Sequence, residues 1–365
     1  MSDPLTHAEL TIDLRAVVAN WTRIGEIAPT AAVAAMVKAD GYGVGAVDVV
    51  GALSTAGCRE FFVAEIGEAV ELRASAPAVD IFVLAGAQPG TLDDLVAHDL
   101  VPVLIDLGQI ERWAERGRRE GRRLRGSVHL DTGMNRTGLD PADTAALLED
   151  PSRLDGVDIV HLMSHLACAD DPTDPLNQRQ LDAYRRLRTR LPMGVASLAN
   201  TPGVALGPAY HFDHVRPGVG LYGTDPSPGR VLGLEPVVSL HAPVLQVRWA
   251  DAGETVGYSA THTLDRERRL ATIGVGYADG VIRAQSGRGH VAFAGHRAPI
   301  VGRVSMDLIT VDLTDVPADV LVGPGSAAEL IGPAVTIDDV AEAAGTIPYE
   351  ILTSLGDRYR RRHIR

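Results

Sequence analysis

A regular alternation of short apolar runs with segments of helical pattern constrains the fold more than any other feature of the chain. The apolar runs occupy residues 31–37, 60–65, 80–85, 101–106, 126–131, 158–165, 195–200 and 214–216. Helical patterns occupy residues 14–28, 67–74, 107–119, 141–148 and 176–190. Eight apolar runs separated by helical or loop segments predict an α/β fold, a TIM-like (β/α)8 barrel in which each run is a buried parallel strand.

The pattern changes after residue 234. Apolar and β-branched runs then follow one another, with glycine and proline turns and almost no helix before residues 336–344. This indicates a second, mainly β domain, and the proline- and glycine-rich piece 223–236 is the expected linker. We therefore expect a barrel domain over residues 12–230 and a mainly β C-terminal domain over residues 231–365, which also takes in residues 1–11.

Charge and cysteine content narrow the possible partners. The formal net charge of -13 argues against nucleic acid or an anionic membrane as partner and favours a small-molecule ligand. Two cysteines, Cys58 and Cys168, are too few for a disulfide framework or a thiolate metal site, and we interpret Cys168 as a packed thiol. No signal peptide or membrane-spanning run is visible, so we expect a cytoplasmic protein.

Polar residues close several of the predicted strands. In a barrel the chemistry is carried at the carboxyl ends of the strands, so these residues should meet at one mouth. They are Lys38 after the first strand, His129 and Asp131 after the fifth, His165 after the sixth, Asn200 and Thr201 after the seventh, and Arg216 after the eighth. Thr201 and the turn at Gly218 follow the last two strands, where barrels commonly bind phosphate.

Lys38 is the candidate catalytic residue, although a lysine at a strand end is more often a solvated ion-pair partner. A lysine that can form a Schiff base beside a phosphate site suits pyridoxal 5'-phosphate, and Arg216 is placed to tune its ring. A metal site on His161 and His165 is the competing interpretation. Their HLMSH context lacks the glutamate of a zincin helix and lies in a strand pattern, so we expect no metal.

Nine short motifs then resemble those of alanine racemases, in the same order and across both predicted domains. They are MVKADGYG, DTGMNRTG, MSHLACAD, LANTPG, VRPGVGLYG, VGYSATHT, GVGYADG, GRVSMD and IPYEI. The resemblance implies a pyridoxal-phosphate-dependent enzyme that interconverts L- and D-alanine with two bases. Lys38 would hold the cofactor and act as one base. Tyr258 would be the other base and reach the cofactor from the partner subunit of a homodimer.

The resemblance also assigns supporting roles. The implied phosphate binders are Tyr42, Thr201, Gly218, Val219 and Tyr349. Arg216 would face the pyridine nitrogen, with His165 and Asn200 supporting the arginine and the ring. Arg136 would hold the substrate carboxylate, with Met306 and Asp307 on the opposite wall. Tyr277 would lie in the access channel, with Tyr349 at its inner gate; a packed ring at the rim is the plain alternative for Tyr277.

One position departs from the family pattern. Two residues before Asp131, where many alanine racemases carry a carbamylated lysine that orients the substrate-binding arginine, this chain has His129. An imidazole cannot form that carbamate, so a racemase of another small amino acid remains an alternative. A non-catalytic pyridoxal-phosphate carrier is a further alternative, but such a function would need neither the second domain nor Tyr258. The last alternative is a decarboxylase of similar architecture, but the cysteine-aspartate and triple-glycine motifs of such enzymes are not visible in this sequence.

Overall fold

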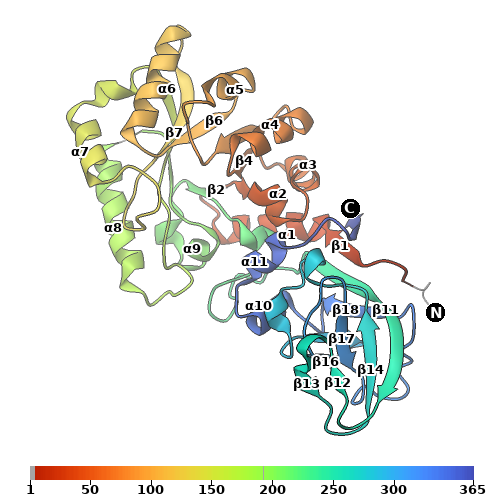
Figure 1. Ribbon diagram of the computed structural model, residues 1–365. Helices are drawn as coiled ribbons and strands as arrows, with labels where there is room; N and C mark the ends of the chain where they lie inside the picture. The colour runs from red at the N-terminus through yellow and green to blue at the C-terminus, as the bar shows by residue number, and fades with distance from the viewer. Residues whose placement is uncertain (1–4, 192) are drawn as a thin grey trace. The chain divides into compact units, whose positions relative to one another are not determined.

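The computed structural model describes residues 5–191 and 193–365. The chain divides into two compact units. One comprises Arg15–Glu235, and the other comprises the described residues up to Leu14 together with Pro236–Arg365. Figure 1 shows both, with helices around a sheet in the first and long strands in the second.

The first unit is built on a closed parallel sheet in the order β2-β10-β9-β8-β7-β6-β5-β4-β3. Its strands are β2 (Ala32–Val33), β3 (Ala35–Met36), β4 (Glu60–Val63), β5 (Asp80–Val83), β6 (Val101–Leu104), β7 (Leu124–His129), β8 (Val157–Met163), β9 (Val195–Ser197) and β10 (His214–Val215). The first apolar run supplies both β2, which pairs with β10, and β3, which pairs with β4. That shared run closes the sheet, and the expected eight-unit barrel is confirmed.

Helices connect the strands of the barrel. They are α1 (Leu14–Ile27), α2 (Lys38–Tyr42), α3 (Ala46–Ala56), α4 (Ile66–Ser75), α5 (Leu92–Ala97), α6 (Leu107–Arg119), α7 (Pro141–Glu149), α8 (Pro175–Arg190) and α9 (Thr201–Ala205). Carboxylates cap α6, α7 and α8, as where Asp106 accepts from Gln109 N at 2.7 Å at the start of α6. Such a cap satisfies a backbone N–H that lacks a partner within the helix.

The second unit is mainly β, as expected. Its main sheet has the order β14-β17-β16-β15-β18-β11-β1-β19. The strands are β1 (Glu9–Asp13), β11 (Val238–Ala250), β14 (Arg268–Ile273), β15 (His290–Phe293), β16 (His296–Val301), β17 (Ile309–Asp312), β18 (Ala327–Ile331) and β19 (Arg360–Ile364), and a separate hairpin joins β12 (Thr255–Val256) to β13 (His262–Thr263). Two helices, α10 (Ile337–Ala344) and α11 (Pro348–Thr353), precede the last strand.

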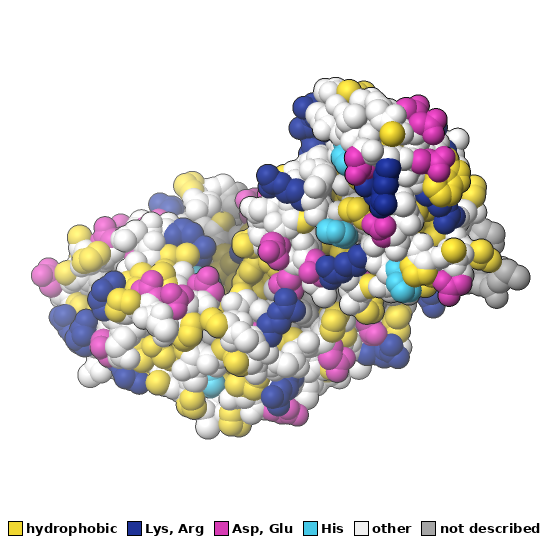
Figure 2. Space-filling view, turned by 90° about the horizontal axis from the view of Figure 1, so that it is seen from below, with side chains coloured by type: hydrophobic (Ala, Val, Ile, Leu, Met, Phe, Trp, Pro, Cys, Tyr) yellow, Lys and Arg dark blue, Asp and Glu magenta, His cyan; other side chains and the backbone are white. Residues whose placement is uncertain are grey.

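The N-terminal strand belongs to this second sheet, where β1 lies antiparallel to β11 and parallel to β19. Charged side chains of both signs are interspersed on the face drawn in Figure 2. Among the described residues, no helix is long and apolar enough to cross a membrane.

Candidate active site

Lys38 follows the first barrel strand and begins α2. This short helix is left-handed over residues 39–41, where φ is 53°, 51° and 60°. Glu68 holds the turn, because its Oε1 accepts a hydrogen bond from Ala39 N at 2.5 Å. Residues other than glycine seldom adopt this backbone, and such strain persists where surrounding contacts fix it. The turn therefore presents Lys38 in a fixed position at the carboxyl end of the strand.

The surroundings of Lys38 favour its neutral amine. Burial lowers the pKa of Lys38, the positive charge of Arg136 lowers it further, and Glu68 acts in the opposite direction. A lysine that loses its proton more readily has more of its neutral amine, the form that acts as nucleophile or base, near neutral pH. The 365 residues contain no second lysine. This count would have singled out Lys38 before any motif was considered.

A cradle of backbone amides lies after the last two strands. Thr201 Oγ1 accepts hydrogen bonds from Gly218 N at 3.0 Å and Gly220 N at 3.2 Å. Tyr42 closes the cradle, since a Cβ added at Gly218 would lie 2.3 Å from its Oη. Val219 is buried in the turn between the two glycines. Amides that converge on one hydroxyl oxygen can equally face a phosphate, so the structure brings four of the five predicted phosphate binders together.

Arg216 is buried and held by the barrel itself. Its guanidinium donates to Ser197 Oγ, to Ser164 O at 2.5 Å and to Leu198 O at 3.5 Å. Burial lowers the pKa of Arg216 to about 10, which still leaves it protonated near neutral pH. No role was assigned from the sequence to Ser197, or to Ser164, which lies in the motif MSHLACAD. Their small side chains lie inside apolar runs, so no sequence signal separated them from core residues.

His165 and Asn200 lie beside each other, with His165 Nε2 3.4 Å from Asn200 Nδ2. Asn200 also caps α9, because its Oδ1 accepts from Gly203 N at 3.0 Å. Burial holds the pKa of His165 well below its usual range, and the charges of Arg216 and Arg136 add to this. Since Arg216 donates its hydrogen bonds to other residues, support of Arg216 by His165 and Asn200 stays a prediction.

The loop after β7 carries Arg136. Asp131 organises this loop, since its carboxylate accepts hydrogen bonds from Gly133 N at 2.8 Å and Asn135 N at 2.9 Å. The Arg136 side chain is exposed and makes no hydrogen bond or ion pair with another described residue. Burial, together with Arg216 and Arg136, lowers the pKa of His129 to about 3. His129 is therefore a neutral imidazole close to an available guanidinium.

Three predicted residues of the second unit share one pocket. Tyr258, Tyr277 and Met306 line a pocket of about 200 Å³, together with Arg283, Arg303, Val304 and Ser305. Tyr258 lies on a strained turn after β12 and is 71% exposed. Tyr277 N donates to Ser305 O at 3.0 Å, which ties its turn to the Met306 segment.

The remaining two residues lie elsewhere in that unit. Asp307 pairs with Arg358 at 2.8 Å, and Tyr349 lies in α11. Neither belongs to the residues that line the Tyr258 pocket.

The two histidines of HLMSH do not converge. His165 lies next to Asn200, whereas His161 Nε2 is 3.2 Å from Glu60 Oε2. Neither cysteine is activated: burial raises the pKa of Cys58 to about 12, and a contact with Asp174 raises that of Cys168.

The carboxyl end of the parallel barrel carries a lysine with a lowered pKa, a cradle of backbone amides and a buried arginine. Together these features define a class of site. It suits a phosphorylated aldehyde cofactor, which the lysine can attack while the amides hold the phosphate. Only glycine fits at residue 218 of this cradle, because the Cβ of any larger residue would collide with Tyr42.

Comparisons with known proteins identify the family. Residues 12–226 match the family model of the alanine racemase N-terminal domain, and residues 237–363 match that of the alanine racemase C-terminal domain. An alanine racemase of Rhodospirillum rubrum is 47% identical over 98% of this chain and 96% of its own length. A catabolic alanine racemase of Mesorhizobium japonicum is 44% identical over 100% of this chain and 95% of its own. The chain belongs to the alanine racemase family.

Solved structures agree with this assignment. The crystal structure of alanine racemase from Bartonella henselae with covalently bound pyridoxal phosphate superposes with a TM-score of 0.95 at 40% identity, covering 98% of this chain and 100% of that one. The alanine racemase from D-cycloserine-producing Streptomyces lavendulae superposes with a TM-score of 0.93 at 34% identity, covering 100% and 98%. The resemblance seen in the motifs is thereby confirmed.

Proposed function

We propose that this chain is a pyridoxal-phosphate-dependent alanine racemase that works as a homodimer. The observation that carries the proposal is the position of Lys38, its only lysine, with a lowered pKa at the carboxyl end of the first barrel strand. Covalently bound pyridoxal phosphate in the Bartonella henselae alanine racemase supports the cofactor. In this proposal the barrel of residues 12–230 holds the cofactor, and the unit of residues 231–365 with 1–11 supplies Tyr258.

The residues would divide the work as follows. The cofactor supplies an electron sink that makes the α proton of a bound amino acid acidic. Lys38 Nζ removes or returns that proton on one face, and Tyr258 Oη of a second subunit does so on the other. Arg136 binds the substrate carboxylate, with Met306 and Asp307 opposite it. Tyr277 and Tyr349 line the way in.

Further residues would hold the cofactor in place. Tyr42, Thr201, Gly218, Val219 and Tyr349 bind the phosphate. Arg216, which stays protonated, faces the pyridine nitrogen and keeps that nitrogen unprotonated. An unprotonated ring is a weaker electron sink, which disfavours transamination. His165 and Asn200 complete the wall around the ring.

Chiral analysis of products from a panel of L-amino acids tests this function. We expect D-alanine from L-alanine, with the rate abolished in Lys38→Ala. Preferred racemisation of another small amino acid would favour the alternative substrate. Pyridoxal phosphate bound to Lys38 without turnover of any amino acid would favour a non-catalytic carrier.

The two bases can be separated by deuterium exchange. Tyr258→Phe is expected to abolish exchange of the α proton in one alanine enantiomer while leaving exchange of the other measurable, because each base faces one side of the substrate. Equal residual exchange from both enantiomers would contradict the assignment.

Mixing inactive subunits tests the shared site. If Tyr258 acts in the partner's site, a Lys38→Ala and Tyr258→Phe heterodimer has one intact site, so statistical mixing should restore about a quarter of wild-type activity. The exposure of Tyr258 motivates this experiment. Absence of any recovery after confirmed subunit exchange would show that the two residues act within one chain.

A further inference from the structure

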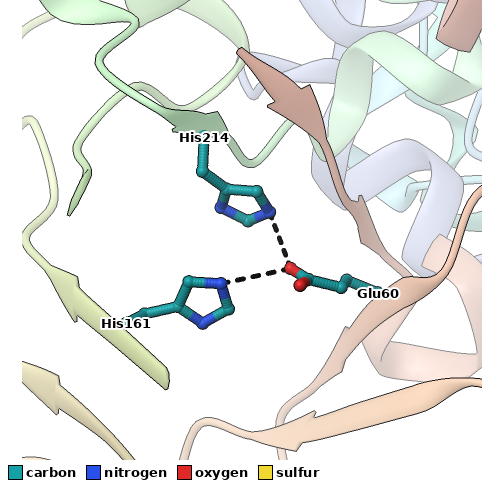
Figure 3. A group of neighbouring side chains, drawn as sticks. All are labelled: Glu60, His161 and His214. Carbon is teal, nitrogen blue, oxygen red and sulfur yellow. Dashed lines mark ion pairs between the residues drawn. The ribbon is translucent and has the colours of Figure 1, made fainter. Parts of the chain in front are cut away.

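Three residues far apart in the sequence meet inside the barrel. Glu60 lies on β4, His161 on β8 and His214 on β10, and both rings point to the same carboxylate oxygen (Figure 3). Nε2 of His214 lies 2.8 Å from Glu60 Oε2, and Nε2 of His161 lies 3.2 Å from it. The rings are buried and stacked, with centroids 4.7 Å apart and 22° between their planes. Nothing in the proposed mechanism uses this group.

Ser197 connects the group to Arg216. Ser197 Oγ lies 3.0 Å from His214 Nδ1 and 2.9 Å from His214 O, and it accepts a hydrogen bond from Arg216 Nη1. A continuous path of polar contacts therefore runs from Arg216 through Ser197 and His214 to Glu60. The His161 ring is not part of this path to Arg216, because its Nδ1 contacts Ser127 Oγ at 3.2 Å.

The charges along this path can be assigned. Burial alone would raise the pKa of Glu60, but the contacts from His161 and His214 outweigh it and hold the pKa well below its usual range, so Glu60 is ionised. Burial lowers the pKa of His214, although Glu60 opposes this, and the ring is neutral near pH 7. Glu60 Oε2 makes no hydrogen bond of acceptable geometry with another described residue, so its contacts with the two rings are electrostatic contacts at ion-pair distance.

These charges fix the direction of the donors. A bare ring nitrogen would repel a carboxylate oxygen at 2.8 Å, so His214 carries its proton on Nε2. His214 Nδ1 is then an acceptor, and the single hydroxyl hydrogen of Ser197 faces both this nitrogen and His214 O. The Arg216 N–H that Ser197 accepts and the Nε2–H of His214 both face along the path toward Glu60, so these two dipoles are aligned with the carboxylate charge.

We propose that Glu60 is a positioning residue for Arg216, acting through His214 and Ser197 as the negative end of a chain of polar contacts that orients the guanidinium. The chain gives the buried arginine a remote counter-charge while leaving the guanidinium itself unneutralised. The proposal rests on the proposed function, in which Arg216 faces the pyridine nitrogen of the cofactor.

Glu60→Gln tests the charge, because glutamine keeps the shape of the side chain and one acceptor oxygen and removes the negative charge. Asp80→Asn is the matched control: Asp80 is the register partner of Glu60 on β5, and it pairs with Arg125 at 2.7 Å instead. We expect kcat for alanine racemisation to fall about tenfold in Glu60→Gln, because the counter-charge of Arg216 is lost, and to stay unchanged in Asp80→Asn.

The ¹⁵N chemical shift of labelled pyridine nitrogen in the bound cofactor gives a second readout, one that a general loss of stability would not move. We expect it to change in Glu60→Gln and to keep the wild-type value in Asp80→Asn, since only Glu60 is linked to Arg216.

Two buried serines keep the test valid if Glu60→Gln does not fold. Ser197 and Ser127 each contact Nδ1 of one histidine of the group, but only Ser197 contacts Arg216. Ser197→Ala should therefore reproduce the ¹⁵N change, and Ser127→Ala should not. The double variant Glu60→Gln/Ser197→Ala should be no slower than the slower single variant, because both remove links of one chain.

Several outcomes would overturn the inference. One is an unchanged ¹⁵N shift in Glu60→Gln and Ser197→Ala, and another is additive losses in the double variant. A stoichiometric divalent metal that copurifies with the wild type and is lost in Glu60→Gln would also overturn it, since the metal would occupy the Nε2 atoms. If the wild type itself fails to bind pyridoxal phosphate or to racemise alanine, the proposed function fails instead.

Discussion

Burial determines which residues near Lys38 carry charge. Arg216 stays protonated with its pKa lowered to about 10, whereas the same effect lowers the pKa of His129 to about 3. His129 is therefore neutral throughout the range in which an enzyme is assayed. Loss of substrate binding through its protonation is expected only below about pH 4, well under the usual range of a histidine.

The absence of a second lysine makes the role of His129 testable. No carbamylated lysine can orient Arg136 in this chain, since Lys38 is the only lysine. We expect racemisation to be equal in carbon-dioxide-depleted buffer with and without added bicarbonate. His129→Lys should introduce a bicarbonate dependence, because a neutral buried amine can take up carbon dioxide.

The comparison with His129→Lys also provides the control for bicarbonate itself, as both proteins are assayed in the same buffers. We propose that neutral His129 orients Arg136 in place of the carbamate, and a bicarbonate requirement in the wild type would contradict this.

At the level of elements, the turn after the first strand stores strain that can be measured. Ala39 is exposed and has φ of 53°, so Ala39→Gly relieves strain and should leave the free energy of unfolding unchanged or slightly higher. Ala145→Gly, at an exposed position inside α7, should cost about 1 kcal/mol. Urea unfolding of both variants measures the difference, and equal losses would show that the turn is unstrained.

The cradle at Gly218 gives a second element-level prediction. Gly218→Ala places a methyl group against Tyr42 Oη, so we expect affinity for pyridoxal phosphate to fall at least about tenfold. Gly51→Ala in α3 is the control, because a Cβ there meets no atom within 4 Å. Fluorescence titration of the cofactor-free proteins measures both affinities. Unchanged affinity in Gly218→Ala would show that the cradle is not part of the phosphate site.

Periodicity predicted the barrel strands to within a few residues, because each is an apolar run that ends at a polar side chain. It did not indicate α3 and α11. Gly51 and a run of β-branched residues weaken the helical signal of α3, and α11 is only six residues long. Motifs indicated the residues around Lys38, whereas the link from Glu60 to Arg216 depends on strands brought together by barrel closure. The spacing of these residues along the sequence does not predict such a contact.

For the whole molecule, buried histidines predict sensitivity to acid. Burial lowers the pKa of His129, His165 and His214 in the folded chain, while in the unfolded chain each titrates near 6.5. Below about pH 6.5 the unfolded state therefore binds more protons, so the free energy of unfolding falls as the pH falls, by up to ~1.4 kcal/mol per pH unit for each histidine.

Urea unfolding near neutral pH and at about pH 5, at fixed protein and cofactor concentrations, measures this slope. His129→Asn should lower it, because asparagine does not titrate. His296→Asn, at an exposed position, should not. An identical slope in His129→Asn and the wild type would mean that His129 makes no contribution.

The single lysine has a practical consequence for labelling this protein. Apart from the amino terminus, Lys38 is its only primary amine, and its lowered pKa makes it reactive at mild pH. Amine-directed dyes, cross-linkers and resins, which decorate most proteins at random, would here report on one position. A limiting amount of such a reagent, with the amino terminus blocked, would count the accessible Lys38 amines in a preparation.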